Sequence, residues 1–148
     1  MSTDRASIDP VVPPPQGQYV PAVLHGDIVY TAGMTPRRDG ELVLTGVVGE
    51  NLSVEQAQAA AALAAGNALT AVRWALPEGA GLRCLRMTVY VACAADFTAL
   101  SAVADGASAA LVAELGSAAL PARSAIGVAA LPSGAPVEVE LTAAVRKI

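Results

Sequence analysis

The stretch LPARSAIGVAALPSGAPVEVEL, residues 120–141, indicates two β-strands and places unusual charges on them. In both Ala122–Val128 and Val137–Val145, neighbouring residues alternate with the two-residue period of a strand. The first segment holds one arginine, Arg123, among small apolar residues, and the second alternates two glutamates with valines. What this lone guanidinium binds is the main question that the sequence raises.

Turn residues predict two hairpins upstream of this stretch. Tyr19–Ala32 contains two β-branched runs separated by a turn at Gly26, and Pro21 favours a sheet edge for the first run. Asp39 and Gly40 indicate a second turn. We therefore expect short antiparallel strands in the first third of the chain.

Helical periodicity appears twice in the middle of the chain. Ser53 and Gln56 have the spacing of a capping box, and apolar residues recur behind them at steps of three and four. Many of these are alanines, which would let the helix lie close to a sheet. The predicted elements of this region are a helix at Ala57–Leu76, a strand at Leu85–Cys93 and a helix at Phe97–Leu115 that Asp96 opens.

This order of elements predicts an α+β fold in which two helices cover one face of a mixed sheet. The second face stays uncovered, and we expect it to hold Arg123 and both glutamates, Glu138 and Glu140, beside apolar residues such as Tyr90. A partly apolar, partly charged face on so small a protein most simply becomes a subunit contact. The sequence therefore predicts a homo-oligomer.

Size and composition narrow the class of protein. The 148 residues suit one domain, assigned here to residues 17–148, and the proline-rich residues 1–16 favour a flexible tail. No apolar run reaches the roughly 18 residues of a membrane span, and the two cysteines suggest neither a disulfide framework nor a zinc site, so we expect a cytoplasmic protein. The net charge of -4 argues against nucleic-acid binding.

Small neighbours give Arg123 a possible function. Ala125 and Gly127 share its side of the strand and would leave a notch with a guanidinium in its wall. Such a group can bind a carboxylate in bidentate fashion, and Glu138 could position a water and move a proton. The alternative is an ion pair between Arg123 and Glu138 that only holds two strands or two subunits in register.

The segment LPARSAIGVAALP followed by VEVE resembles the Rid family (YjgF/YER057c/UK114), also labelled reactive intermediate deaminases or L-PSP endoribonucleases. GQYVPAV, YTAGMTP and MTVYV extend the likeness over nearly the whole chain from Gly17. The resemblance implies a chorismate-mutase-like fold in a homotrimer, with three sites between subunits. It implies that Arg123 binds the carboxylate of a 2-imino or 2-enamino acid while Glu138 is associated with the water that releases a keto acid and ammonia.

The resemblance also implies that backbone amides at Gly33 and Ala125 hold the ligand, that Tyr19 reaches in from a neighbouring subunit, and that no metal or organic cofactor takes part. Well-defined imine deaminases of the family tend to be more polar at several of these positions, so this chain would have a more apolar site and belong to a longer, divergent branch. VADGAS, residues 103–108, also marks that branch. The full set of predicted substrate-binding residues is Tyr19, Ala32, Gly33, Met34, Tyr90, Phe97, Ser101 and Ala125.

Three functions stay open: an imine or enamine deaminase, a catalytically silent binder of small carboxylates, and a ribonuclease, which the acidic balance disfavours. Chorismate mutase activity follows only from fold analogy, and a dicarboxylate would need more cations than one. His25, the only histidine, is expected to be an exposed loop residue, and Trp74 is expected to pack near the end of a helix.

Overall fold

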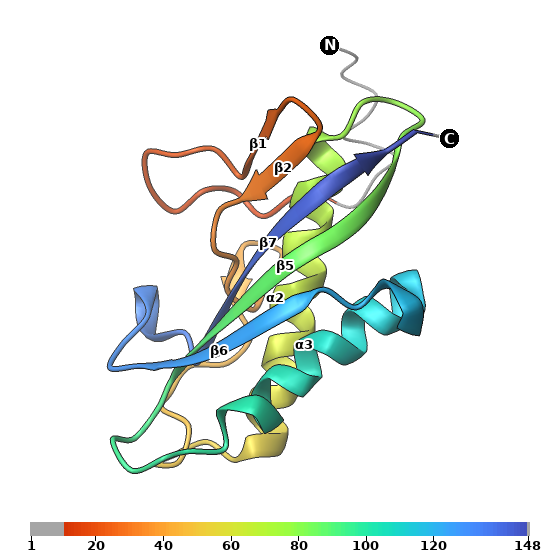
Figure 1. Ribbon diagram of the computed structural model, residues 1–148. Coiled ribbons are helices and arrows are strands. Elements are labelled where there is room, and N and C mark those ends of the chain that lie inside the picture. The colour runs from red at the N-terminus through yellow and green to blue at the C-terminus, as the bar shows by residue number, and fades with distance from the viewer. Residues whose placement is uncertain (1–10, 148) are drawn as a thin grey trace.

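The computed structural model of the chain describes residues 11–147 (Figure 1). Residues 1–10, most of the predicted tail, lie outside the described part. Val12 packs against the core although it belongs to the same predicted tail. The elements in chain order are β1 (Ala22–His25), β2 (Ile28–Thr31), β3 (Arg37–Arg38), β4 (Glu41–Leu42), α2 (Val54–Ala75), β5 (Gly81–Ala92), α3 (Leu100–Leu115), the 3-10 turn η1 (Ser117–Ala119), β6 (Ala122–Val128), the 3-10 turn η2 (Pro132–Gly134) and β7 (Val137–Arg146).

The main sheet has the strand order β1-β2-β7-β5-β6. Strands β5 and β6 run parallel, and the other neighbours are antiparallel, so the sheet is mixed. Both helices lie on the same side of it, as Figure 1 shows, and this confirms the predicted α+β fold. β1 is an edge strand, as Pro21 indicated, and Asp39 and Gly40 form the turn between β3 and β4 with φ angles of 55° and 82°.

The capping box begins α2 as predicted. The Ser53 hydroxyl accepts from the Gln56 amide at 3.1 Å, and the Gln56 side chain accepts from the Ser53 amide at 2.9 Å. The buried side of the helix is mostly alanine, which brings its backbone close to its neighbours. At Gly106 of α3 an added Cβ would lie only 2.2 Å from the carbonyl oxygen of Gln58. The two helices therefore touch through their backbones.

Alternation along β5 separates the two faces of the sheet. Met87, Val89 and Val91 are fully buried beneath the helices. The face on the other side, which we call the open face, carries Tyr30 at 52% exposure and Ile126 at 42%. An uncovered, partly apolar face is thus present, as the sequence predicted.

The second helix begins later than predicted. α3 starts at Leu100, its first residue is preceded by Ala99 without a side-chain cap, and Asp96 is exposed. The Phe97 amide instead donates to the Ala94 carbonyl in a turn, and the Phe97 ring lies against Gly49. This turn precedes α3, and the helix begins three residues later, at Leu100.

Candidate functional site

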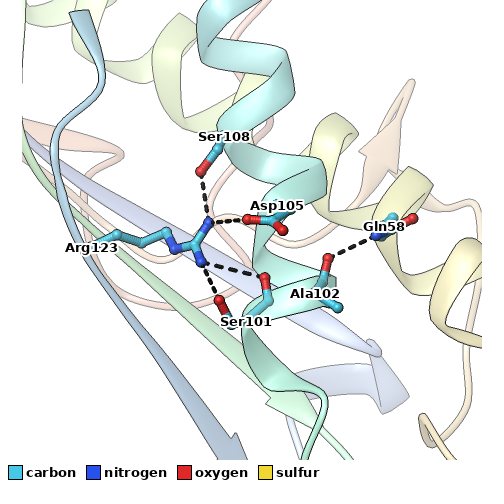
Figure 2. Close-up of polar contacts among 6 residues, drawn as sticks. All are labelled: Gln58, Ser101, Ala102, Asp105, Ser108 and Arg123. Atoms are coloured by element: carbon cyan, nitrogen blue, oxygen red, sulfur yellow. Dashed lines mark hydrogen bonds and ion pairs between the residues drawn. The ribbon is translucent and has the colours of Figure 1, made fainter.

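Arg123 projects from β6 toward α3, where it meets a cluster of oxygen atoms (Figure 2). Its Nη1 donates to Asp105 Oδ1 at 2.9 Å and to Ser108 Oγ at 2.8 Å. Its Nη2 donates to Ser101 Oγ at 2.7 Å and, more weakly, to the Ser101 carbonyl at 3.3 Å. All four Nη hydrogens thus have acceptors, whereas Nε makes no hydrogen bond within residues 11–147.

The fold brings these groups together through α3. Ser101, Asp105 and Ser108 are four and three residues apart, so they lie on one side of the helix. Two contacts hold α3 against α2. Gly106 of α3 lies against the backbone of Gln58, and Gln58 Nε2 donates to the Ala102 carbonyl at 2.8 Å, a hydrogen bond that Figure 2 also shows. The oxygen cluster is therefore held against β6 by the contact between the two helices.

The expectation that Arg123 lies on the open face is wrong. Arg123 is paired with Met87 and Ala125 with Val89 in the parallel register of β5 and β6, and paired residues share a face. Arg123, Ala125 and Gly127 consequently lie on the helix side, at the sheet edge. Ala125 and Gly127 do flank Arg123 on one side of β6, as expected, and the space at Gly127 is bounded by Cys93 and Leu100.

Glu138 lies on the opposite, open face, where Tyr90 is its partner in the sheet. Its carboxyl group rests against Gly33, since a Cβ there would be 2.5 Å from the Glu138 carboxyl carbon. Burial, with a further contribution from the Glu140 charge, raises the pKa of Glu138 above its ordinary value. Glu140 accepts a hydrogen bond from the Tyr90 hydroxyl at 2.9 Å, which together with burial raises the pKa of Tyr90.

Within one protomer, therefore, Arg123 and Glu138 form no ion pair. The Arg123 charge is balanced by Asp105 instead. The structural alternative of an Arg123–Glu138 pair that holds two strands of one chain in register is excluded by this geometry.

The other predicted residues divide between the two regions. Ser101 contacts Arg123, whereas Tyr90 and Gly33 lie with Glu138. The Gly33 amide makes no hydrogen bond among residues 11–147, so it is a free donor beside the Glu138 carboxyl. Met34 does not face a site with its side chain, because it is buried in the core and its backbone pairs with that of Val139.

For the three remaining predicted residues, Tyr19, Ala32 and Phe97, the structure shows contacts with groups other than Arg123 and Glu138. The Ala32 amide donates to the Pro21 carbonyl at 2.8 Å, and Phe97 packs beneath Gly49. Tyr19 is 47% exposed and accepts a hydrogen bond from the Gln16 amide, and it belongs to no strand.

Asp105 and Ser108 are functional candidates that the sequence analysis missed. Both belong to VADGAS, which had been noted only as a mark of a divergent branch. The signal was a polar stripe at Ser101, Asp105 and Ser108 in a helix otherwise rich in alanine.

Several remaining candidates have no partner at either site. His25 is exposed, as expected, but it is the last residue of β1 rather than a loop residue. Trp74 is 43% exposed and so packs less than predicted. Cys84 and Cys93 are free thiols, and burial raises the pKa of Cys84. Residues 11–147 contain neither a cluster of His, Cys, Asp and Glu suited to a metal ion nor a helix long and apolar enough to cross a membrane.

Comparison with known proteins shows the family to which the chain belongs. The model of the family described as Endoribonuclease L-PSP matches residues 11–145. The chain belongs to this family. The L-PSP family is the one whose YjgF/Rid signature we identified at Leu120–Pro132, so that resemblance is confirmed.

Relatives of this L-PSP family protein agree in sequence and in fold. Protein TCP17 of Trypanosoma cruzi is 35% identical over 133 residues, which cover 88% of this chain and 83% of TCP17. The crystal structure of Atu1372 from Agrobacterium tumefaciens, a protein of unknown function, matches with a TM-score of 0.80 at 31% identity, over 90% of this chain and 86% of that one. The YjgF gene product of E. coli matches with a TM-score of 0.63 at 28% identity, over 92% and 94% of the two chains.

Proposed function

We propose that this protein hydrolyses small 2-imino or 2-enamino acids to 2-keto acids and ammonia, with Arg123 binding the substrate carboxylate and Glu138 acting on water. The observation that best supports this function is the half-buried Glu138 carboxyl group beside the free Gly33 amide. A carboxylate there is poorly solvated, and its raised pKa makes it a stronger base than an exposed glutamate.

The chemistry needs only these groups and water. In the protonated imine, the carbon carries a C=NH₂⁺ group and is already electrophilic. Ionised Glu138 takes one proton from the attacking water, whose oxygen forms the new C–O bond. Proton transfer to nitrogen then lets the C–N bond break, and one iminium plus one water become one ketone plus one ammonium ion. Glu138 returns to its ionised form, so the balance requires no cofactor.

Arg123 and Glu138 lie on opposite faces of one sheet, so a site that uses both requires two protomers. The exposed apolar residues of the open face, Val23, Tyr30 and Ile126, are suited to a contact between subunits. We accordingly propose a homotrimer, as the family resemblance implies, in which the Arg123 edge of one protomer meets the Glu138 face of the next. Tyr19 would join the site from one of the two protomers.

A second candidate is a carboxylate-binding protein without turnover. It is favoured by the occupied Nη groups of Arg123 and by the apolar Ala32 and Ala125, which offer no side-chain hydrogen bond to the far end of a substrate. Cleavage of RNA, which the family description names, lacks a comparable observation, because the net charge is -4 and few cations are available for phosphates.

A coupled assay separates these functions. An amino-acid oxidase generates imino acids from a panel of amino acids, and the rate of ammonia release is followed with and without the protein. We expect Arg123→Ala to lose at least about tenfold in kcat/KM, and Glu138→Gln to lose about a hundredfold in kcat while it still binds a 2-keto acid. Arg38→Ala, which removes an exposed arginine of β3, is the matched control and should behave as wild type.

Binding is measured in parallel as a ligand-dependent rise in melting temperature. Keto-acid binding without ammonia release from any substrate would replace the deaminase by the silent binder. Equal activity in wild type and Arg123→Ala, with circular dichroism showing both folded, would reject Arg123 as the carboxylate-binding group.

A further inference from the structure

The oxygen cluster around Arg123 contains one group of a different kind from the others. Ser101 and Ser108 offer neutral hydroxyls, whereas Asp105 offers a carboxylate, the same chemical group that the proposed substrate would present. Asp105 therefore binds the Arg123 guanidinium through the same kind of group that a carboxylate ligand would use. Its contact is monodentate, from Nη1 to Oδ1 at 2.9 Å.

This contact is easy to break. In the single protomer, the Asp105 side chain is 66% exposed, whereas that of Arg123 is 20% exposed. Ion pairs that are this open to solvent are weak, because water replaces the lost contact to the carboxylate. The two serine hydroxyls would keep the guanidinium in place after Asp105 turns away, since they bind different nitrogens.

The backbone of Asp105 lies at the contact between the two helices. Asp105 is next to Gly106, where the backbones of α3 and α2 touch, so this part of α3 has no room to move toward α2. Only the short side chain of Asp105 can rotate. A displaced Asp105 would therefore stay within a few ångströms of the bound ligand and repel any second negative charge on it.

We propose that Asp105 is an internal competitor for Arg123 that sets which carboxylates bind: it lowers the affinity of all of them and discriminates against dianions in favour of monoanions. This inference rests on the proposed carboxylate site and adds its specificity-determining residue. The expected ligand is therefore a small monocarboxylic acid whose remaining part is uncharged or cationic, as in a protonated imino acid.

Two probes of equal length test the selectivity. 2-Oxopentanoate is a monoanion and 2-oxoglutarate a dianion, and both have five carbons and the same 2-keto carboxylate. Affinities of the full-length protein for each are measured by calorimetry, for wild type and for Asp105→Asn, which keeps an acceptor oxygen and removes the charge. We expect Asp105→Asn to bind 2-oxopentanoate about two- to fivefold more tightly. The gain for 2-oxoglutarate should be larger, at about fivefold or more, because a second repulsion is removed.

Glu114→Gln is the matched control. It changes the net charge by the same amount on the same helix, but Glu114 pairs with Arg73 of α2 rather than with Arg123. The control should bind both acids as wild type does. A merely structural role of Asp105 would not alter the ratio between the two acids.

Each outcome decides the matter. Tighter binding by Asp105→Asn, with a larger gain for the dianion than for the monoanion, supports the competitor. Unchanged or weaker binding by the variant, or an equal gain in Glu114→Gln, overturns it and leaves the carboxylate site in place. No binding of either acid to wild type and variant alike overturns the proposed function and the competitor together.

Discussion

The backbone contact between the two helices at Gly106 offers a sharp test of how α3 is held. In Gly106→Ala, the new Cβ would lie 2.2 Å from the Gln58 carbonyl oxygen and 2.7 Å from its carbonyl carbon and Cα. These distances are short of ordinary van der Waals contact, which begins at 3.4 Å. All three atoms belong to the backbone, so no change of rotamer can relieve the clash. The helices must move apart.

The expected change in the free energy of unfolding of Gly106→Ala combines opposing effects. Alanine at a helix interior is favoured over glycine by about 1 kcal/mol. Overpacking costs about 1–3 kcal/mol, and separation of the helices would weaken the hydrogen bond from Gln58 to the Ala102 carbonyl, which contributes about 1 kcal/mol. We therefore expect a net loss of about 1–3 kcal/mol in the free energy of unfolding.

Gly66 of α2 provides the matched control, because an added Cβ there meets nothing within 4 Å. Gly66→Ala should stabilise the protein by about 0.5–1 kcal/mol, so the two identical substitutions should have opposite signs. Urea denaturation at one fixed protomer concentration measures both, and comparable slopes with urea concentration would show that the unfolded states match. A Gly106→Ala protein as stable as wild type, beside a stabilised Gly66→Ala, would refute the inferred backbone contact.

Two further predictions concern the cap of α2 and the titration of Glu138. Ser53→Ala should lower the free energy of unfolding by about 1 kcal/mol, while Ser117→Ala, which removes an exposed hydroxyl, should leave it unchanged; urea denaturation checks both. Because its folded-state pKa is raised, Glu138 favours the folded state when protonated, and this stability is lost as pH rises through the folded pKa. Glu138→Gln should thus be more stable than wild type at neutral pH and equal to it in acid; denaturation curves in which wild type is the more stable at neutral pH would contradict this.

Local patterns were sufficient to predict most elements of the fold. Strand β6 has the predicted bounds, Ala122–Val128, and the capping box at Ser53 begins α2, because both depend on neighbouring residues alone. The start of α3 was wrong for a tertiary reason. Asp96 is of a residue type that is preferred at helix N-caps, but the Phe97 ring packs against Gly49, which is distant in sequence.

The faces of the sheet show where such patterns fail. Alternation correctly grouped Arg123 with Ala125, and Glu138 with Glu140, but it says nothing of how two strands are aligned. The parallel register that pairs Met87 with Arg123 decides that alignment, and a shift of one residue would have moved Arg123 to the other face. Asp105 was missed for a related reason, since its role depends on the packing of α3 against β6.

Separation of Arg123 from Glu138 has a chemical consequence of its own. A guanidinium beside Glu138 would lower the pKa of that carboxyl and weaken it as a base. In the protomer this does not happen, since Arg123 is balanced by Asp105, and burial together with Glu140 raises the pKa of Glu138. A substrate that bridges two protomers would bind its carboxylate to one group and present its iminium carbon to the other. Within one protomer, the opposite faces of the sheet thus keep the Arg123 guanidinium away from Glu138, so burial and the Glu140 charge determine the direction in which the pKa of Glu138 moves.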